Sequence, residues 1–221
     1  MINMDDKERM LIKTLNKLGV DTRYVSLYEE EIYVNNLKFS RFSRKKEDEF
    51  HQSYPDIQVI RSKLFQKICV KVSRTVKNQI MPRDILYIED DGSVESVLLK
   101  VVLEPYKRKY GIRLTDNIDE ANKLVSTLCI NDFVSDYISL MITGNKITNS
   151  LENDVVYPLM HIDKSWINDW ICSTALDYSF CDESENKTED EIIEFLDTKI
   201  PNVCESIIQS VDYLDAVDRK I

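Results

Sequence analysis

Residues 85–100 read ILYIEDDGSVESVLLK, and this stretch decides the fold. The apolar run from Ile85 to Ile88 stops at a turn that contains Gly92, and apolar residues at helical spacing follow at once. This order predicts a strand, a tight turn and a helix, the arrangement in which many α/β proteins bind phosphate on the first N–H groups of the helix. Carboxylates stand where such a site needs N–H donors and positive charge: Glu89, Asp90, Asp91 and Glu95.

The chemistry of this turn argues against a bound phosphate. Only one glycine is present, and a β-carbon at the neighbouring position hinders the close approach of backbone to phosphate. Two like charges about 4 Å apart repel by about 4 kcal/mol at an effective dielectric constant of about 20, whereas a micromolar complex has only about 8 kcal/mol of binding free energy. We therefore interpret the turn as a nucleotide loop that has lost its function, with Ser93 or Asp91 capping the helix. The alternative is that the acids hold Mg²⁺, which bridges phosphate oxygens.

The segments after residue 84 alternate between strand and helix patterns. This alternation predicts an α/β sheet with parallel crossovers. The predicted strands are 85–88, 112–115 and 154–160, and the predicted helices are 94–110, 118–142, 164–175, 188–200 and 203–217.

The N-terminal part has a different pattern. Residues 4–19 predict a helix that ends at Gly19, and residues 22–42 predict two short strands. The polar stretch 43–56 is the best candidate for a boundary. We therefore expect an α+β extension at 1–56 and an α/β domain at 57–221.

The positive charge is concentrated in one segment. A net charge of −10 argues against a protein whose whole surface binds nucleic acid. Between Ile57 and Arg83 there is no acidic residue, and apolar side chains at helical spacing predict a basic amphipathic helix over 58–80. Seven cations lie between Ile57 and Arg83, and the candidate binding residues among them are Lys63, Lys67, Lys71, Arg74 and Lys77. An ordinary solvated face accounts for them, and so does an anionic partner, either RNA or an acidic protein surface.

Other candidates for chemistry are few, and we predict no catalytic residue and no metal site. The five cysteines, at 69, 129, 172, 181 and 204, form no C-x-x-C pair, which predicts reduced thiols in a cytoplasmic protein. His51 and His161 have no neighbouring motif. No stretch approaches the roughly 18 apolar residues of a membrane span, so no membrane contact is expected.

The order of basic helix, strand, glycine turn and helix resembles the PP-loop ATP pyrophosphatase superfamily, whose turn reads S-G-G-x-D-S. Residues 114–128 are similar to its D-D-E-A-E-T-like strand and helix, and residues 155–170 to its R-P-L segment, with Tyr157 in place of arginine. The resemblance implies a Rossmann-like parallel sheet flanked by helices, the adenine nucleotide alpha hydrolase-like fold. It also implies that the degenerate loop consists of Asp90, Asp91, Gly92, Ser93, Glu95 and Ser96.

Residues 188–214 resemble the closing segment of the cytoplasmic tRNA 2-thiolation protein 2 family, which is close to F-P-S-T-V-S-T-V-x-R-T-x-x-K-L. The small and apolar positions are kept, whereas Gln209 and Tyr213 replace basic ones. In that family the chain is the non-catalytic partner of the PP-loop enzyme that places sulfur on the wobble uridine of tRNA. The resemblance therefore implies a subunit without a cofactor that pairs with a catalytic PP-loop thiolase. Such a subunit would help to bind tRNA through the basic helix and would meet a ubiquitin-like sulfur carrier through its partner.

Two alternatives stay open at this stage. One is an active Mg-ATP-dependent PP-loop enzyme that modifies RNA, with the acids of the turn holding the metal. The other is an α/β adaptor whose basic helix binds an acidic protein. The first predicts ATP binding, and the second predicts binding without a preference for RNA.

Overall fold

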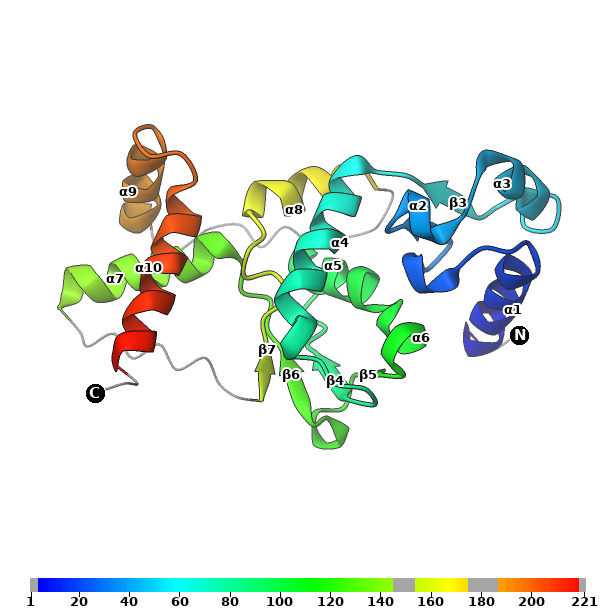
Figure 1. Cartoon of the computed structure of the whole chain (residues 1–221), viewed down its shortest axis with the longest axis horizontal. Coiled ribbons are helices and arrows are strands. Elements are labelled where there is room, and N and C mark those ends of the chain that lie inside the picture. Colours follow the sequence, from blue (N-terminus) through cyan, green and yellow to red (C-terminus); the bar gives the residue numbers. More distant parts are fainter. Residues whose placement is uncertain (1–3, 145–153, 175–186, 219–221) are drawn as a thin grey trace.

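The computed structural model describes residues 4–144, 154–174 and 187–218 and contains two sheets (Figure 1). The strands are β1 Val25–Tyr28, β2 Glu31–Val34, β3 Gln58–Ile60, β4 Ile85–Ile88, β5 Arg113–Thr115, β6 Lys123–Val125 and β7 Val155–Val156. The helices are α1 Met4–Lys17, α2 Leu37–Ser40, α3 Arg44–His51, α4 Lys63–Thr75, α5 Val94–Leu103, α6 Tyr106–Tyr110, α7 Ile130–Thr143, α8 Lys164–Ile171, α9 Lys187–Asp197 and α10 Val203–Asp218. Within the described ranges, no helix is both long and apolar enough to cross a membrane.

The second sheet is parallel throughout, with the strand order β5-β4-β6-β7. Leu86 and Ile88 of β4 point into the core, and α5 is buried on nearly all sides against the sheet, α8 and the N-terminal strands. A helix that is apolar all round belongs inside a protein. The connections leave β4 toward β5 and then turn back to β6, so the turn after β4 lies at the point where the strand order reverses. Ligands of open α/β sheets commonly bind at such a point.

Two of the predicted helices contain breaks. The helix predicted over 94–110 is two helices, because Pro105 lacks the N–H that continues a helix and its ring crowds the preceding turn. The helix predicted over 118–142 begins only at Ile130, and the residues before it form β6. A three-residue strand has too few residues to show its own periodicity.

The structure contains two elements before β4 that the sequence did not predict. The stretch 43–56, predicted to be a polar boundary, holds α3, whose N-terminus is capped by Ser43. The basic helix begins at Lys63 rather than 58, because residues 58–60 form β3 and pair with β2. Since β3 continues the first sheet past residue 57, the division into 1–56 and 57–221 stays a prediction.

The first sheet packs directly on the parallel one. Tyr33 of β2 is fully buried, and its ring lies 5.1 Å from that of Phe65 on α4 and 6.0 Å from that of Trp170 on α8, measured between centroids. The opposite face of β2 carries Ile32 and Val34 into a second core with α1 and α3. A third core joins α7, α9 and α10. Figure 1 shows these parts side by side along the molecule.

A buried ion pair fastens the first sheet to the end of α5. Glu104 is only 4% exposed and accepts a hydrogen bond from Leu27 N at 3.0 Å and another from Arg108 Nη2 at 2.6 Å. Arg108 also donates to the carbonyls of Thr22, at 3.0 Å, and Val25, at 2.7 Å. The Arg108 side chain therefore binds both the Glu104 carboxylate and the backbone at the start of β1.

We expect Arg108→Ala to lower the free energy of unfolding by about 3–5 kcal/mol, because it leaves Glu104 buried without its charged partner. Urea denaturation followed by tryptophan fluorescence measures this. The matched control is Arg113→Ala, which removes an exposed pair with Glu120 and should cost less than about 1 kcal/mol. Equal losses in the two variants would contradict this role of Arg108.

Asp84, at the start of β4, gives a second prediction. It is buried, accepts from Met81 N at 2.7 Å and from Asn122 Nδ2 at 3.1 Å, and pairs with Lys123 at 2.9 Å. Burial acts to raise the pKa of Asp84, but these partners outweigh it and hold the pKa below its usual value. Its stabilising effect is therefore complete above the unfolded pKa of 3.8 and is lost as the pH falls through the lower folded pKa.

The expected result is a smaller loss of stability for Asp84→Asn than for wild type when urea denaturation is repeated at pH 5 and pH 3. The other carboxylates titrate in both proteins, so the difference isolates Asp84. Parallel acid profiles would show that Asp84 contributes nothing to acid sensitivity.

Candidate functional site

The turn between β4 and α5 is closed by its own side chains. Gly92 has a φ of +71°, which turns the chain toward the helix. The Ser93 N–H donates to Asp91 Oδ1 at 2.9 Å, and the Ser96 N–H donates to Ser93 Oγ at 3.1 Å. Two of the N–H groups that a phosphate would use are thus occupied, with Ser93 as the helix cap.

The charges of the turn are partly balanced. Lys100 Nζ lies 2.7 Å from Asp90 Oδ1, so Asp90 is not the unpaired charge that the sequence suggested. Burial acts to raise the pKa of Asp91, but hydrogen bonds from Ser93 and Ser96 hold it below its usual value. Asp91 is therefore ionised at neutral pH and places its own carboxylate at the positive end of the helix dipole. Glu95 lies in the first turn of α5 and is half-buried. The predicted loop residues thus lie together, and their loss of nucleotide binding stays a prediction.

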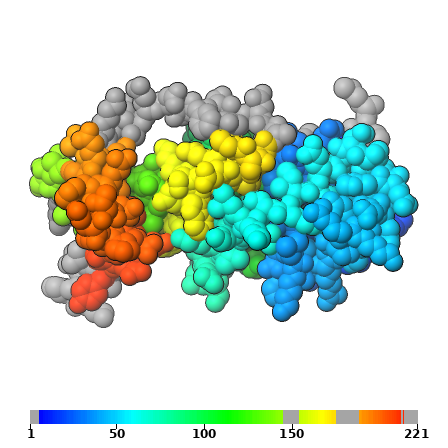
Figure 2. Space-filling view, turned by 90° about the horizontal axis from the view of Figure 1, so that it is seen from above, coloured from blue at the N-terminus to red at the C-terminus, as the bar shows by residue number. Residues whose placement is uncertain are grey.

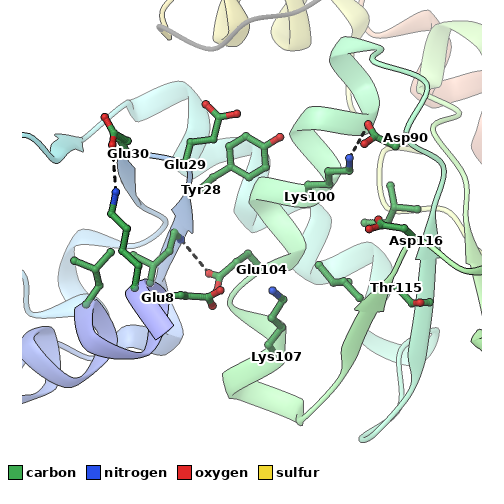
Figure 3. A pocket seen from close by; sticks show the side chains of 15 residues that line it. Glu8, Tyr28, Glu29, Glu30, Asp90, Lys100, Glu104, Lys107, Thr115 and Asp116 are labelled. Atoms are coloured by element: carbon green, nitrogen blue, oxygen red, sulfur yellow. Dashed lines mark hydrogen bonds and ion pairs between the residues drawn. The ribbon is translucent and has the colours of Figure 1, made fainter. Parts of the chain in front are cut away.

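A cavity of about 620 Å³ lies beside this turn (Figure 3). Its walls come from α1, the β1–β2 hairpin, α5 and the ends of β4 and β5. The charged groups that line it are Glu8, Glu29, Glu30, Asp90, Glu104 and Asp116, with Lys7, Lys100 and Lys107. Ion pairs engage four of these carboxylates, those of Glu8, Glu30, Asp90 and Glu104, and the lining keeps a net negative charge. Sequence reasoning missed this cavity because half of its wall comes from the N-terminal extension, which carries no motif.

The cations of α4 have different surroundings. Lys63, Lys67 and Arg74 are exposed on the helix, as is Lys77 in the short 3₁₀ turn that follows it. Lys67 and Lys71 lie over the ring of Trp166 from α8, at 5.8 and 5.4 Å from its centroid. Such contacts between a cation and an aromatic face are attractive. The structure therefore places an aromatic surface among the predicted cations.

Lys71 is the exception among these cations. Its Nζ lies 3.0 Å from Glu205 Oε1 of α10 and donates to the carbonyl of His161 at 2.8 Å. The ring of His161 contacts the other oxygen of Glu205 at 3.0 Å. Burial acts to raise the pKa of Glu205, but Lys71 and His161 outweigh it and hold the pKa below its usual value. Lys71 thus holds α10 against α4 and is not a free cation.

The cysteines provide no reactive thiol in the described core. Burial raises the pKa of Cys129 to about 12, and Asp132 accepts a hydrogen bond from its thiol at 2.9 Å. Burial also raises the pKa of Cys69 and of Cys204. Cys172 is exposed, and Cys181 lies outside the described residues. Among the residues that the structure describes, no three His, Cys, Asp or Glu side chains gather to hold a metal ion.

No model of a known protein family matches this sequence. Over 93 residues the chain is 38% identical to a protein of Methanocaldococcus jannaschii described as a probable sulfurtransferase. The match covers 41% of this chain and 27% of that protein, so the chain spans about a quarter of the length of this relative.

The structure is similar to that of the U34-tRNA thiolase NcsA from Methanococcus maripaludis, which was solved with its [4Fe-4S] cluster. The TM-score is 0.57 at 13% sequence identity, over 74% of this chain and 84% of that one. The α/β fold with a parallel sheet flanked by helices is therefore confirmed, and it is the PP-loop thiolase fold. The two similar proteins both have descriptions that refer to sulfur transfer, one matched over part of its sequence and the other by its fold. The described cysteines do not fit a cluster of the kind that NcsA holds.

The thiols give a direct prediction. We expect iodoacetamide to modify Cys172 in the folded protein and to modify Cys129 only after unfolding, because the reactive species is the exposed thiolate. Peptide mass spectrometry over a time course, with and without urea, measures both rates. Modification of Cys129 in the folded protein as fast as that of Cys172 would contradict this assignment and reopen the question of a sulfur-bearing thiol.

Proposed function

We propose that this chain is a non-catalytic subunit of a tRNA 2-thiolation complex, in which it pairs with an active PP-loop thiolase and helps to hold the tRNA. The observation that carries the proposal is the closed turn after β4. Asp91 and Ser93 use the N–H groups of a phosphate loop, while the surrounding fold is that of a thiolase. A thiolase fold with a filled phosphate position serves better as a structural partner than as an enzyme.

The charge distribution supports the same role. The cavity beside the turn is acidic, whereas α4 presents Lys63, Lys67 and Arg74 to solvent. In the proposed complex the partner binds ATP, activates the uridine carbonyl and receives sulfur from a ubiquitin-like carrier. This chain contributes phosphate contacts that weaken steeply with salt.

The first test is calorimetric titration of the purified chain with Mg-ATP. We expect no saturable binding, that is, a dissociation constant above about 1 mM. The Asp90→Ala/Asp91→Ala variant distinguishes a turn that has lost nucleotide binding from one whose carboxylates hold Mg²⁺. If they held Mg²⁺, wild type would bind ATP and this variant would not, and the chain would be an enzyme. Asp48→Ala, an exposed acid on α3, is the control.

The second test is purification of the tagged chain from its source cells at moderate salt. We expect a PP-loop partner with an intact S-G-G-x-D-S turn in the eluate, together with tRNA. Recovery of the chain without such a partner would contradict the proposed pairing.

A further inference from the structure

Two hollows along α4 form one surface, which we call the α4 groove. One, of about 490 Å³, lies between α4 and Trp166 of α8, and the other, of about 260 Å³, lies between α4, α2 and α6. They share Asn35, Asn36 and Val70. Figure 2 shows α4 on the surface between α8 and the N-terminal segment. One wall of the groove therefore comes from the N-terminal extension.

The charges of the α4 groove all have the same sign. Its lining contains six cations and no carboxylate: Arg23, Lys63, Lys67, Lys71, Arg74 and Lys109. Arg23 and Lys71 have carboxylate partners just outside the lining, Asp21 and Glu205. In a chain with 39 acidic and 29 basic residues, a lining of this kind is a local excess of positive charge. It fits a polyanion.

Aromatic side chains line the α4 groove together with these cations. Phe39 of α2 is 52% exposed and leans on Tyr24, with the ring centroids 5.3 Å apart. Trp166 lines the larger hollow beneath Lys67 and Lys71, and Tyr106, only 7% exposed, lines the smaller one with Lys109 over its ring at 5.4 Å. Aromatic rings along a basic channel are the means by which proteins bind single-stranded nucleic acid, since every base can stack on them.

Two amides complete the surface. The side-chain oxygen of Asn35 accepts from Ser26 Oγ, and that of Asn36 accepts from Phe39 N, both at 3.0 Å. These bonds fix the two side chains and leave their NH₂ groups as donors at the junction of the hollows. Such donors suit the oxygen atoms of bases or of ribose.

We propose that the α4 groove binds a single-stranded segment of RNA, with a base stacked on Phe39 and phosphates on Lys63, Lys67 and Arg74. The inference rests on the proposed function for the identity of that RNA as tRNA. It assigns a role to the N-terminal extension, which supplies Phe39 and both asparagines. A double helix cannot stack its bases in this way, so unpaired nucleotides are the ligand.

The test uses the full chain and fluorescence anisotropy with a labelled 12-nucleotide oligouridine at two salt concentrations. We expect the oligouridine to bind more tightly than a duplex of the same length. Phe39→Ala should weaken binding about tenfold with little change in its salt dependence, and Phe39→Tyr should restore it. Lys67→Ala should weaken binding and also lower the salt dependence.

Matched controls lie on other helices. Phe195 of α9 is 63% exposed, and Lys13 of α1 is exposed outside the groove, so Phe195→Ala and Lys13→Ala should leave binding unchanged. If Phe39→Ala has no effect, or if the duplex or polyglutamate competes as well as the oligouridine, the groove is not a single-strand site. If the chain does not bind oligouridine but the thiolase partner is recovered with it, only the single-strand site is overturned. If the chain binds oligouridine but no thiolase partner is recovered, only the proposed subunit role is overturned.

Discussion

Glu104 and Arg108 lie one helical turn apart where α5 ends and α6 begins, and both side chains are largely withdrawn from water. A carboxylate in this position is costly unless every lone pair finds a donor. Arg108 and the Leu27 N–H supply those donors, and Arg108 in turn needs the carbonyls of β1 and of the turn before it. This ion pair therefore adds a polar attachment to the apolar packing of Tyr33 on Phe65 and Trp170, and together they hold the N-terminal sheet on the parallel one. The hairpin then walls the acidic cavity, and Asn35, Asn36 and α2 wall the groove along α4.

The sequence predicted the elements that have a strong local signal. The sequence predicts β4, the turn at Gly92 and α5 because a glycine separates two apolar runs of different period. β6 was missed because it has only three residues and is held in place by distant partners, Lys123 by Asp84 and Leu124 by β7. The break between α5 and α6 also has a local signal, since Pro105 interrupts the apolar pattern of the helix that was predicted over 94–110.

The candidate site was predictable only where its residues adjoin in the sequence. Asp91, Ser93 and Ser96 bond within five residues, so the closed turn follows from the stretch itself. Lys71 and Glu205 lie 134 positions apart, and no periodicity in the sequence predicts that a carboxylate of α10 pairs with a lysine of α4. The same holds for the cavity and the groove, whose walls combine segments that share no pattern.

The cavity beside the turn and the α4 groove have an excess of charges of opposite sign. A polyanion that approached the turn after β4 would meet Asp91 and the carboxylates of the cavity, whereas along α4 it would meet a lining with six cations and no carboxylate. The difference in electrostatic potential steers an anionic RNA backbone toward α4 before any contact forms. In the proposed complex, the acidic cavity therefore favours a position of the reacting nucleotide in the partner subunit, because the turn and the cavity of this chain repel a backbone that the cations of α4 attract.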